Sequence, residues 1–202
     1  MRSVLAIAGA GLLLLTLPLW TAAAQTGDPV AAVWKEQHLT FTYMGRTSRY
    51  SCDGLRDKML ALLMDLGARR DMKITPVGCF EDRPSTRPGW LSPSLALVFS
   101  SPALPDPTAQ PLHAGDLAAV DARFEPFTLT SDAFRNLSVA DCELVEEFAR
   151  QVLPKLAARD VKSDITCVPY QASGSRFLLR GQILRALPRA EQSPGVRSGR
   201  LN

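Results

Sequence analysis

In the first half of the chain, apolar residues recur at spacings that predict three strands and one helix. The short run Phe41–Tyr43 and the alternating segment Ser94–Ser100 are typical of strands, and an extended segment runs from Met72 to Cys79. Between them, one apolar helical face predicts a helix that begins at Cys52 and ends near Gly67. The residues of that face are Leu55, Met59, Leu62, Leu63 and Leu66.

The second half repeats this order. Phe127–Leu129 and Arg176–Leu184 predict strands, and Val161–Cys167 is a third extended segment. Cys142 lies in the first turn of a predicted helix that reaches Leu156–Arg159, with a Ser-x-x-Asp capping box before it. Pro154 predicts a kink or an early end of that helix, because proline removes a helical hydrogen bond.

We therefore predict an α+β fold of two repeated β-α-β-β units, with both helices on one face of a largely antiparallel sheet. A ferredoxin-like or split arrangement is the nearest common plan. The single domain covers 25–187, with the first repeat at 38–100, a Pro-rich connection at 101–121 and the second repeat at 122–187. The tail 188–202 lacks apolar periodicity and is expected to be disordered.

The four cysteines take equivalent places in the two units. Four cysteines allow three pairings. Each unit has one cysteine at its helix start and one at the end of the next strand, which favours Cys52–Cys79 and Cys142–Cys167, one disulfide per repeat. A helix that packs back across a strand brings those two positions within disulfide distance.

The N-terminus has the three regions of a secretory signal peptide. Arg2 supplies the positive charge, an uncharged stretch runs from Val4 to Trp20, and Ala22 and Ala24 occupy the small-residue positions of a cleavage site. We expect residues 1–24 to be removed after Ala24 and the protein to be periplasmic or secreted. The rival interpretation, an uncleaved anchor, is disfavoured by the short apolar stretch. No stable membrane insertion is expected after cleavage.

The net charge and the motifs that the sequence lacks argue against several classes of function. The formal net charge of +3 falls to +2 without Arg2, which is too small to indicate a nucleic-acid partner. Paired cysteines leave no thiol nucleophile, and the sequence has no Cys-x-x-Cys, Gly-x-Ser-x-Gly, Ser-x-x-Lys or phosphate-binding loop. His38 and His113 have no metal-ligand partners at regular spacing, so we predict neither a metal site nor a cofactor.

The segment from Tyr43 to Tyr50 is the candidate site. It joins the first strand to the first helix and lies at the positive end of that helix. Tyr43, Arg46, Arg49 and Tyr50 supply groups that bind an anion or a sugar. The alternative is a solvated loop whose tyrosines pack on the sheet. The second half has no matching Arg/Tyr cluster.

Four features resemble a family of uncharacterised exported proteins of proteobacteria. They are Trp34 before a strand, the Tyr-x-Gly-x-Thr-Ser loop, Tyr-Ser-Cys at the helix start and Leu-Gly-Ala-Arg at its end. The resemblance covers mainly 34–79 and implies no activity.

We expect a non-catalytic exported protein that binds, or helps to assemble, a component of the cell envelope. Peptidoglycan is one concrete ligand, by analogy of fold alone. The partner's identity is not specified by these residues. The alternative is a periplasmic hydrolase with a dispersed site near His38, Arg46 and Arg49.

Overall fold

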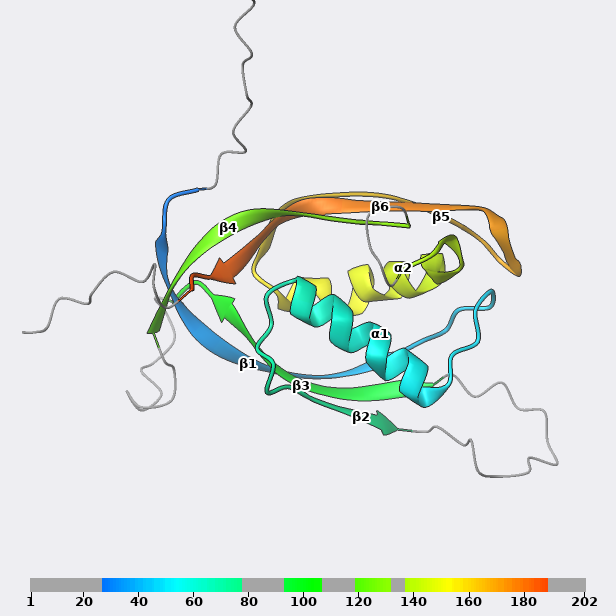
Figure 1. Ribbon diagram of the computed structural model, residues 1–202, viewed down its shortest axis with the longest axis horizontal. Coiled ribbons are helices and arrows are strands. Elements are labelled where there is room, and N and C mark those ends of the chain that lie inside the picture. Colours follow the sequence, from blue (N-terminus) through cyan, green and yellow to red (C-terminus); the bar gives the residue numbers. More distant parts are fainter. Residues whose placement is uncertain (1–26, 78–92, 107–118, 132–136, 189–202) are drawn as a thin grey trace, which may run out of the picture.

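The fold is a six-stranded antiparallel sheet with two α-helices (Figure 1). The computed structural model describes residues 27–77, 93–106, 119–131 and 137–188. Two short 3₁₀ helices, η1 and η2, flank the second α-helix. The elements in chain order are β1 (Val30–Thr42), α1 (Cys52–Asp65), β2 (Lys73–Val77), β3 (Ser94–Ala103), β4 (Ala119–Thr130), η1 (Val139–Asp141), α2 (Cys142–Gln151), η2 (Leu153–Lys155), β5 (Ala158–Val168) and β6 (Gln171–Ala186).

The sheet consists of two three-stranded sections joined by a short ladder. The strand order is β2-β3-β1-β4-β6-β5, so each half of the chain contributes one section. Between the sections, β1 and β4 pair only over Val30–Val33 and Ala119–Ala122. Beyond this ladder end the two strands diverge, and the sections curve apart around the helices (Figure 1).

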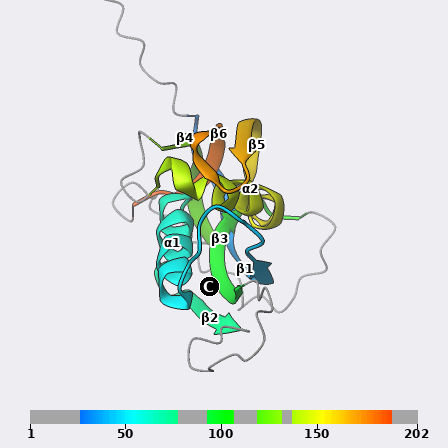
Figure 2. The same cartoon turned by 90° about the vertical axis from the view of Figure 1, so that its right-hand side faces the viewer.

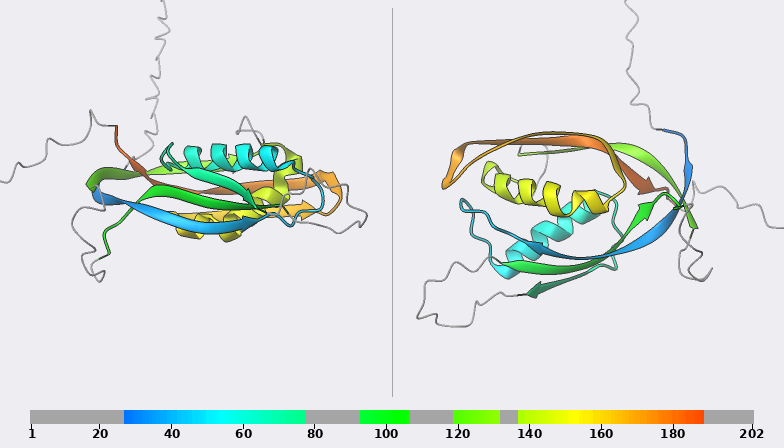
Figure 3. Two further views of the ribbon diagram at one scale, coloured as in Figure 1. Left: turned by 90° about the horizontal axis from the view of Figure 1, so that it is seen from below. Right: turned by 180° about the vertical axis from the view of Figure 1, so that it is seen from behind.

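Both helices lie between the two sections. Viewed from the end, one section is above, the other is below, and α1 and α2 lie side by side in the middle (Figure 2). The view from behind shows the same arrangement (Figure 3, right). Alternation along the strands turns every second side chain inward, as Leu95, Leu97 and Phe99 do in β3. These side chains and the apolar helix faces form one core.

The first helix begins at Cys52 as predicted, but the second is shorter than the predicted stretch that reaches Leu156–Arg159, where β5 begins instead. Ser51 caps α1 by accepting a hydrogen bond from the Gly54 N–H at 3.0 Å. After α1, Gly67 adopts a positive φ of 88°, a conformation that glycine enters without a Cβ clash. The α2 helix ends at Gln151, and Pro154 lies in the 3₁₀ turn that follows.

The α+β class, the antiparallel sheet and the two helices are confirmed, while several boundaries need correction. The first strand begins at Val30, well before the predicted repeat at 38, because its first residues form the ladder to β4. The connection is shorter than 101–121, since β3 continues to Ala103 and β4 begins at Ala119. The chain order β-α-β-β-β-α-β-β also differs from the ferredoxin-like β-α-β-β-α-β order.

Some predictions lie outside the described residues. These are the signal peptide, almost all of the tail, His113 and Cys79. Within the described ranges, no helix has the length and apolar character needed to cross a membrane.

Candidate functional site

The loop 43–51 lies at the end of the molecule opposite the ladder. The N-termini of α1 and α2 point toward this end, and η1 and the β5–β6 turn at Pro169–Tyr170 lie there too (Figure 1). We call these four features, loop 43–51, η1, the turn and the two helix N-termini, the distal end. The loop belongs to the first half of the chain, but five of its described hydrogen bonds reach residues of the second half.

The two predicted tyrosines point inward. The Tyr43 ring is 2% exposed, and its hydroxyl donates to the Ser48 carbonyl at 3.0 Å. The Tyr50 ring meets it edge to face with 4.9 Å between ring centroids. A Cβ on Gly45 would overlap the Tyr43 ring, so the loop requires glycine at that position. The two rings therefore stabilise the loop from its inner side, which is close to the alternative of a loop whose tyrosines pack on the sheet.

Asp141, at the junction of η1 and α2, is the centre of a buried polar network. Its carboxylate accepts hydrogen bonds from the Tyr50 hydroxyl, from the Lys58 ammonium at 2.9 Å and from the Ser138 backbone N–H at 2.7 Å. The bond from Ser138 is the one that the predicted capping box requires. Tyr50 and Lys58 belong to the first half, so Asp141 links the two halves.

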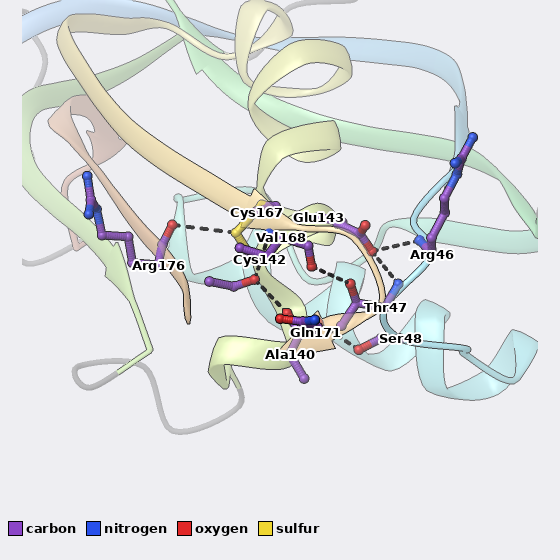
Figure 4. The surroundings of a disulfide bond; sticks show 11 residues. Arg46, Thr47, Ser48, Ala140, Cys142, Glu143, Cys167, Val168, Gln171 and Arg176 are labelled. Atoms are coloured by element: carbon purple, nitrogen blue, oxygen red, sulfur yellow. Dashed lines mark hydrogen bonds between the residues drawn. A yellow bond between two sulfur atoms is a disulfide. The ribbon is translucent and has the colours of Figure 1, made fainter. Parts of the chain in front are cut away.

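Glu143 forms the second link. One of its carboxylate oxygens accepts the backbone N–H groups of Arg46 and Thr47, both at 2.7 Å (Figure 4). Two consecutive N–H groups converging on one carboxylate make a small anion-binding concavity, here occupied by the protein's own side chain.

Burial and hydrogen bonds shift the pKa values of Asp141, Tyr43 and Tyr50. Burial raises the pKa of the Asp141 carboxyl, but hydrogen bonds from Tyr50, Lys58 and Ser138 outweigh it and leave the pKa below its ordinary value. Burial, followed by the charge of Glu143, raises the pKa of Tyr43. Burial and the hydrogen bond to Asp141 raise the pKa of Tyr50. Both phenols therefore stay neutral across the physiological range.

A disulfide holds the second half of the distal end. Cys142, the first residue of α2, is bonded to Cys167 near the end of β5, with 5.6 Å between the Cα atoms (Figure 4). This is the pairing predicted from the spacing of the cysteines. Cys52 is also in a disulfide, and its predicted partner Cys79 lies outside the described residues.

The predicted arginines face outward. Arg46 and Arg49 are exposed, and the Arg46 side chain extends away from the disulfide (Figure 4). His38 is not brought to this loop. It lies on the outer face of β1 with 66% of its side chain exposed, and its ring contacts Glu36 at 2.6 Å.

Sequence reasoning missed the acids that organise the site. In the sequence, Asp141 is only the last residue of the Ser-x-x-Asp capping box, and no local pattern distinguishes Glu143. Their cross-chain partners depend on how the halves dock, which no local pattern reports. Within the described ranges, no three His, Cys, Asp or Glu side chains are placed to hold one metal ion.

Comparison with known proteins adds no family to this description. No protein-family model, curated protein or solved structure matches the chain.

Proposed function

We propose that this protein is a non-catalytic binding protein of the cell envelope, exported by a signal peptide that is removed after Ala24. Its distal end is the binding surface. An oxidising compartment is supported by the disulfide at Cys142–Cys167. The envelope component itself is the subject of the experiments below.

One observation carries the proposal: the distal end is hydrogen-bonded inside and exposed outside. The acids that have reactive potential, Asp141 and Glu143, each hold internal hydrogen bonds. Arg46 and Arg49, in the same loop, are both exposed. A surface whose polar interior is satisfied and whose exterior offers cations is suited to binding a partner.

The hydrolase hypothesis has less support. A hydrolase needs a base, a nucleophile or a pair of acids converging on one point. His38 is on the outer face of β1, where its ring contacts Glu36, and no hydrogen bond or ion pair described for it reaches loop 43–51. The placement of His38 therefore favours binding over hydrolysis.

We also propose that the two halves arose by duplication of a β-α-β-β unit. Both halves pair their strands in the same order. Over the stretch from Val30 to Arg69, matching residues recur ninety positions later: Val30 and Val120, Ala32 and Ala122, Leu39 and Leu129, Cys52 and Cys142, Leu66 and Leu156, and Arg69 and Arg159.

The ladder and two cation–π contacts support the same relation. In the ladder, Ala31 pairs with Asp121, the residue ninety positions later, as a two-fold axis through that pair requires. Arg69 lies over the Trp34 ring in the first half. Arg159 lies over the Phe124 ring, 3.8 Å from its centroid, in the second.

Affinity capture tests the proposed binding function. The protein is purified from the periplasmic fraction of cells that express the whole chain, and its mass reports whether residues 1–24 are absent. It is immobilised and exposed to three probes: envelope protein extract, purified peptidoglycan and vesicles of envelope lipid. We expect Arg46→Ala/Arg49→Ala to lose a probe that the wild type captures.

The matched control is Lys162→Ala/Arg180→Ala, which removes two exposed cations that pair directly across β5 and β6. It should capture as the wild type does. Equal capture by both double variants would show that the distal end is not the binding surface. Turnover of a peptidoglycan or ester substrate that depends on His38 would favour the hydrolase.

A further inference from the structure

We propose that the distal end docks reversibly on an anionic lipid bilayer. Met44, Val139 and Tyr170 enter the interface between headgroups and acyl chains, and Arg46 and Arg49 contact the headgroup phosphates. The inference rests on the proposed function and names the partner of that same surface.

Exposed apolar side chains gather at the distal end. Met44 is 63% exposed, Val139 is 41% exposed and Tyr170 is 64% exposed. They come from three segments: loop 43–51, η1 and the β5–β6 turn. Two hydrogen bonds hold these segments together, from the Ser48 hydroxyl to the Ala140 carbonyl at 2.6 Å and from the Thr47 hydroxyl to the Val168 carbonyl at 3.3 Å (Figure 4).

The backbone at Tyr170 is the second observation. Val168 pairs with Gln171, so Pro169 and Tyr170 form a two-residue turn. Proline suits the first position, but Tyr170 has a φ of 64°, where glycine or asparagine is ordinarily found. A tyrosine pays a steric cost there and buries little of its ring in return. An outlier of this kind indicates that the exposed ring has a role outside folding.

The charge at the surface suits an anionic partner. Arg46 and Arg49 are exposed, and the positive ends of both helix dipoles point the same way. The acids Asp141 and Glu143 are buried and hydrogen-bonded. The exposed acids of the first turns of α1, Asp53 and Asp57, share Arg56 at 2.7 and 3.1 Å, which offsets part of their repulsion of a negative surface.

A bilayer fits this surface better than a folded protein does. The three apolar side chains come from three separate segments, and a rigid partner would need a complementary pocket for each. A bilayer interface conforms to projecting side chains. Tyrosine is enriched at that depth, and arginines near an anionic leaflet add attraction. Two such signals together give reversible attachment.

Vesicle sedimentation tests the inference. The protein from the periplasmic fraction is mixed with vesicles containing phosphatidylglycerol, and with vesicles of phosphatidylcholine alone. We expect binding to the first, and weaker binding as salt is raised. Arg46→Ala/Arg49→Ala should weaken the partition coefficient about 30-fold, at roughly fivefold per arginine. Met44→Ser/Tyr170→Gly should weaken it about tenfold.

The controls sit away from the distal end. Leu104→Ser removes an exposed apolar side chain just after β3, near the ladder. Lys162→Ala/Arg180→Ala removes two exposed cations from the outer face. Both should sediment as the wild type does. Circular dichroism melting of every variant separates loss of binding from loss of folding.

The outcomes distinguish the inference from the proposed function. If phosphatidylglycerol vesicles leave the wild type in solution while Arg46 and Arg49 are needed to capture a protein or peptidoglycan, the lipid inference is wrong and the binding function stands. If no probe is captured, both fail. Equal loss in the distal and control variants would also overturn the inference.

Discussion

Ser51 and Asp141 lie ninety positions apart, at the starts of the two helices, and their side chains accept hydrogen bonds from different parts of the chain. Ser51 accepts one hydrogen bond from its own helix, at Gly54. Asp141 accepts bonds from Tyr50 and Lys58 of the other half as well as from its own Ser138. Asp53 and Glu143 differ likewise: Asp53 is 70% exposed beside Arg56, whereas Glu143 is 8% exposed under loop 43–51.

The two halves of the chain are alike at the ladder and differ at the distal end. At the ladder, both halves contribute the same kind of strand and the same arginine–aromatic contact. At the distal end, the first half supplies the loop and the second half supplies the acids that receive it. The proposed binding surface is therefore at the end where the two halves differ.

The largest loss of stability is expected at Asp141, where a substitution tests the difference between the two helix starts. Asp141→Ala removes a buried carboxylate and leaves Lys58 and Tyr50 without their acceptor, and should lower the free energy of unfolding by about 3 kcal/mol. Ser51→Ala, at the matching position, should cost about 1 kcal/mol, the usual value for a helix cap. Urea unfolding of both variants measures the difference. Equal losses would mean that the network does not join the halves.

Alkaline pH should weaken the same interface by a slightly smaller amount. Tyr43 and Tyr50 have a raised pKa in the folded protein. Stability is therefore unchanged below the ordinary tyrosine pKa of about 10 and falls above it, because only the unfolded chain releases the two protons. From pH 10 to 11 the loss should be about 2 kcal/mol.

Chemical unfolding at several pH values measures this dependence. Tyr50→Phe is the control, since it removes one of the two titrating phenols and should reduce the slope by about half. A wild-type slope that Tyr50→Phe leaves intact would show that other groups titrate, and would contradict the burial of Tyr50 against Asp141.

A smaller effect is expected at the loop glycine. Gly45→Ala places a Cβ against the Tyr43 ring, which must move within a packed site. The cost should be about 1–2 kcal/mol, typical of overpacking. A Tyr43→Phe/Gly45→Ala double variant should still lose stability, because the clash involves the ring as well as the hydroxyl. Thermal unfolding gives the comparison, and full recovery in the double variant would assign the contact to the hydroxyl alone.

The sequence predicts the local features of this fold, but not how the two halves of the chain pack against each other. The apolar face from Leu55 to Leu66 and the early helix end before Pro154 are encoded within a few residues of where they act, and each has the predicted outcome. The same holds for Cys142–Cys167, where two equivalent spacings chose among the pairings. Partners 90 to 110 residues apart, such as Arg46 and Glu143 or Thr42 and Gln151, leave no local signal.

The candidate loop shows the same limit within one segment. Tyr43, Arg46, Arg49 and Tyr50 were predicted as one ligand-binding group. Side chains of a strand alternate between its two faces, but a loop has no such regular period. The sequence therefore does not predict that the tyrosines point inward and the arginines outward. The structure divides the group into a tyrosine pair that packs inward, with Tyr43 buried and Tyr50 half-buried, and an exposed arginine pair that the proposed function uses.

The smallest effect has the opposite sign. Tyr170→Gly relieves the positive φ at the β5–β6 turn and should raise the free energy of unfolding by about 0.5–1 kcal/mol, since glycine enters this conformation without the Cβ clash. Glycine also gives the unfolded chain more freedom, which limits the gain. The matched variant is Gly174→Ala in β6, where a φ of 92° should make alanine destabilising. If Tyr170→Gly instead lowers stability, the ring contributes to folding, and its cost no longer argues for a role at the surface.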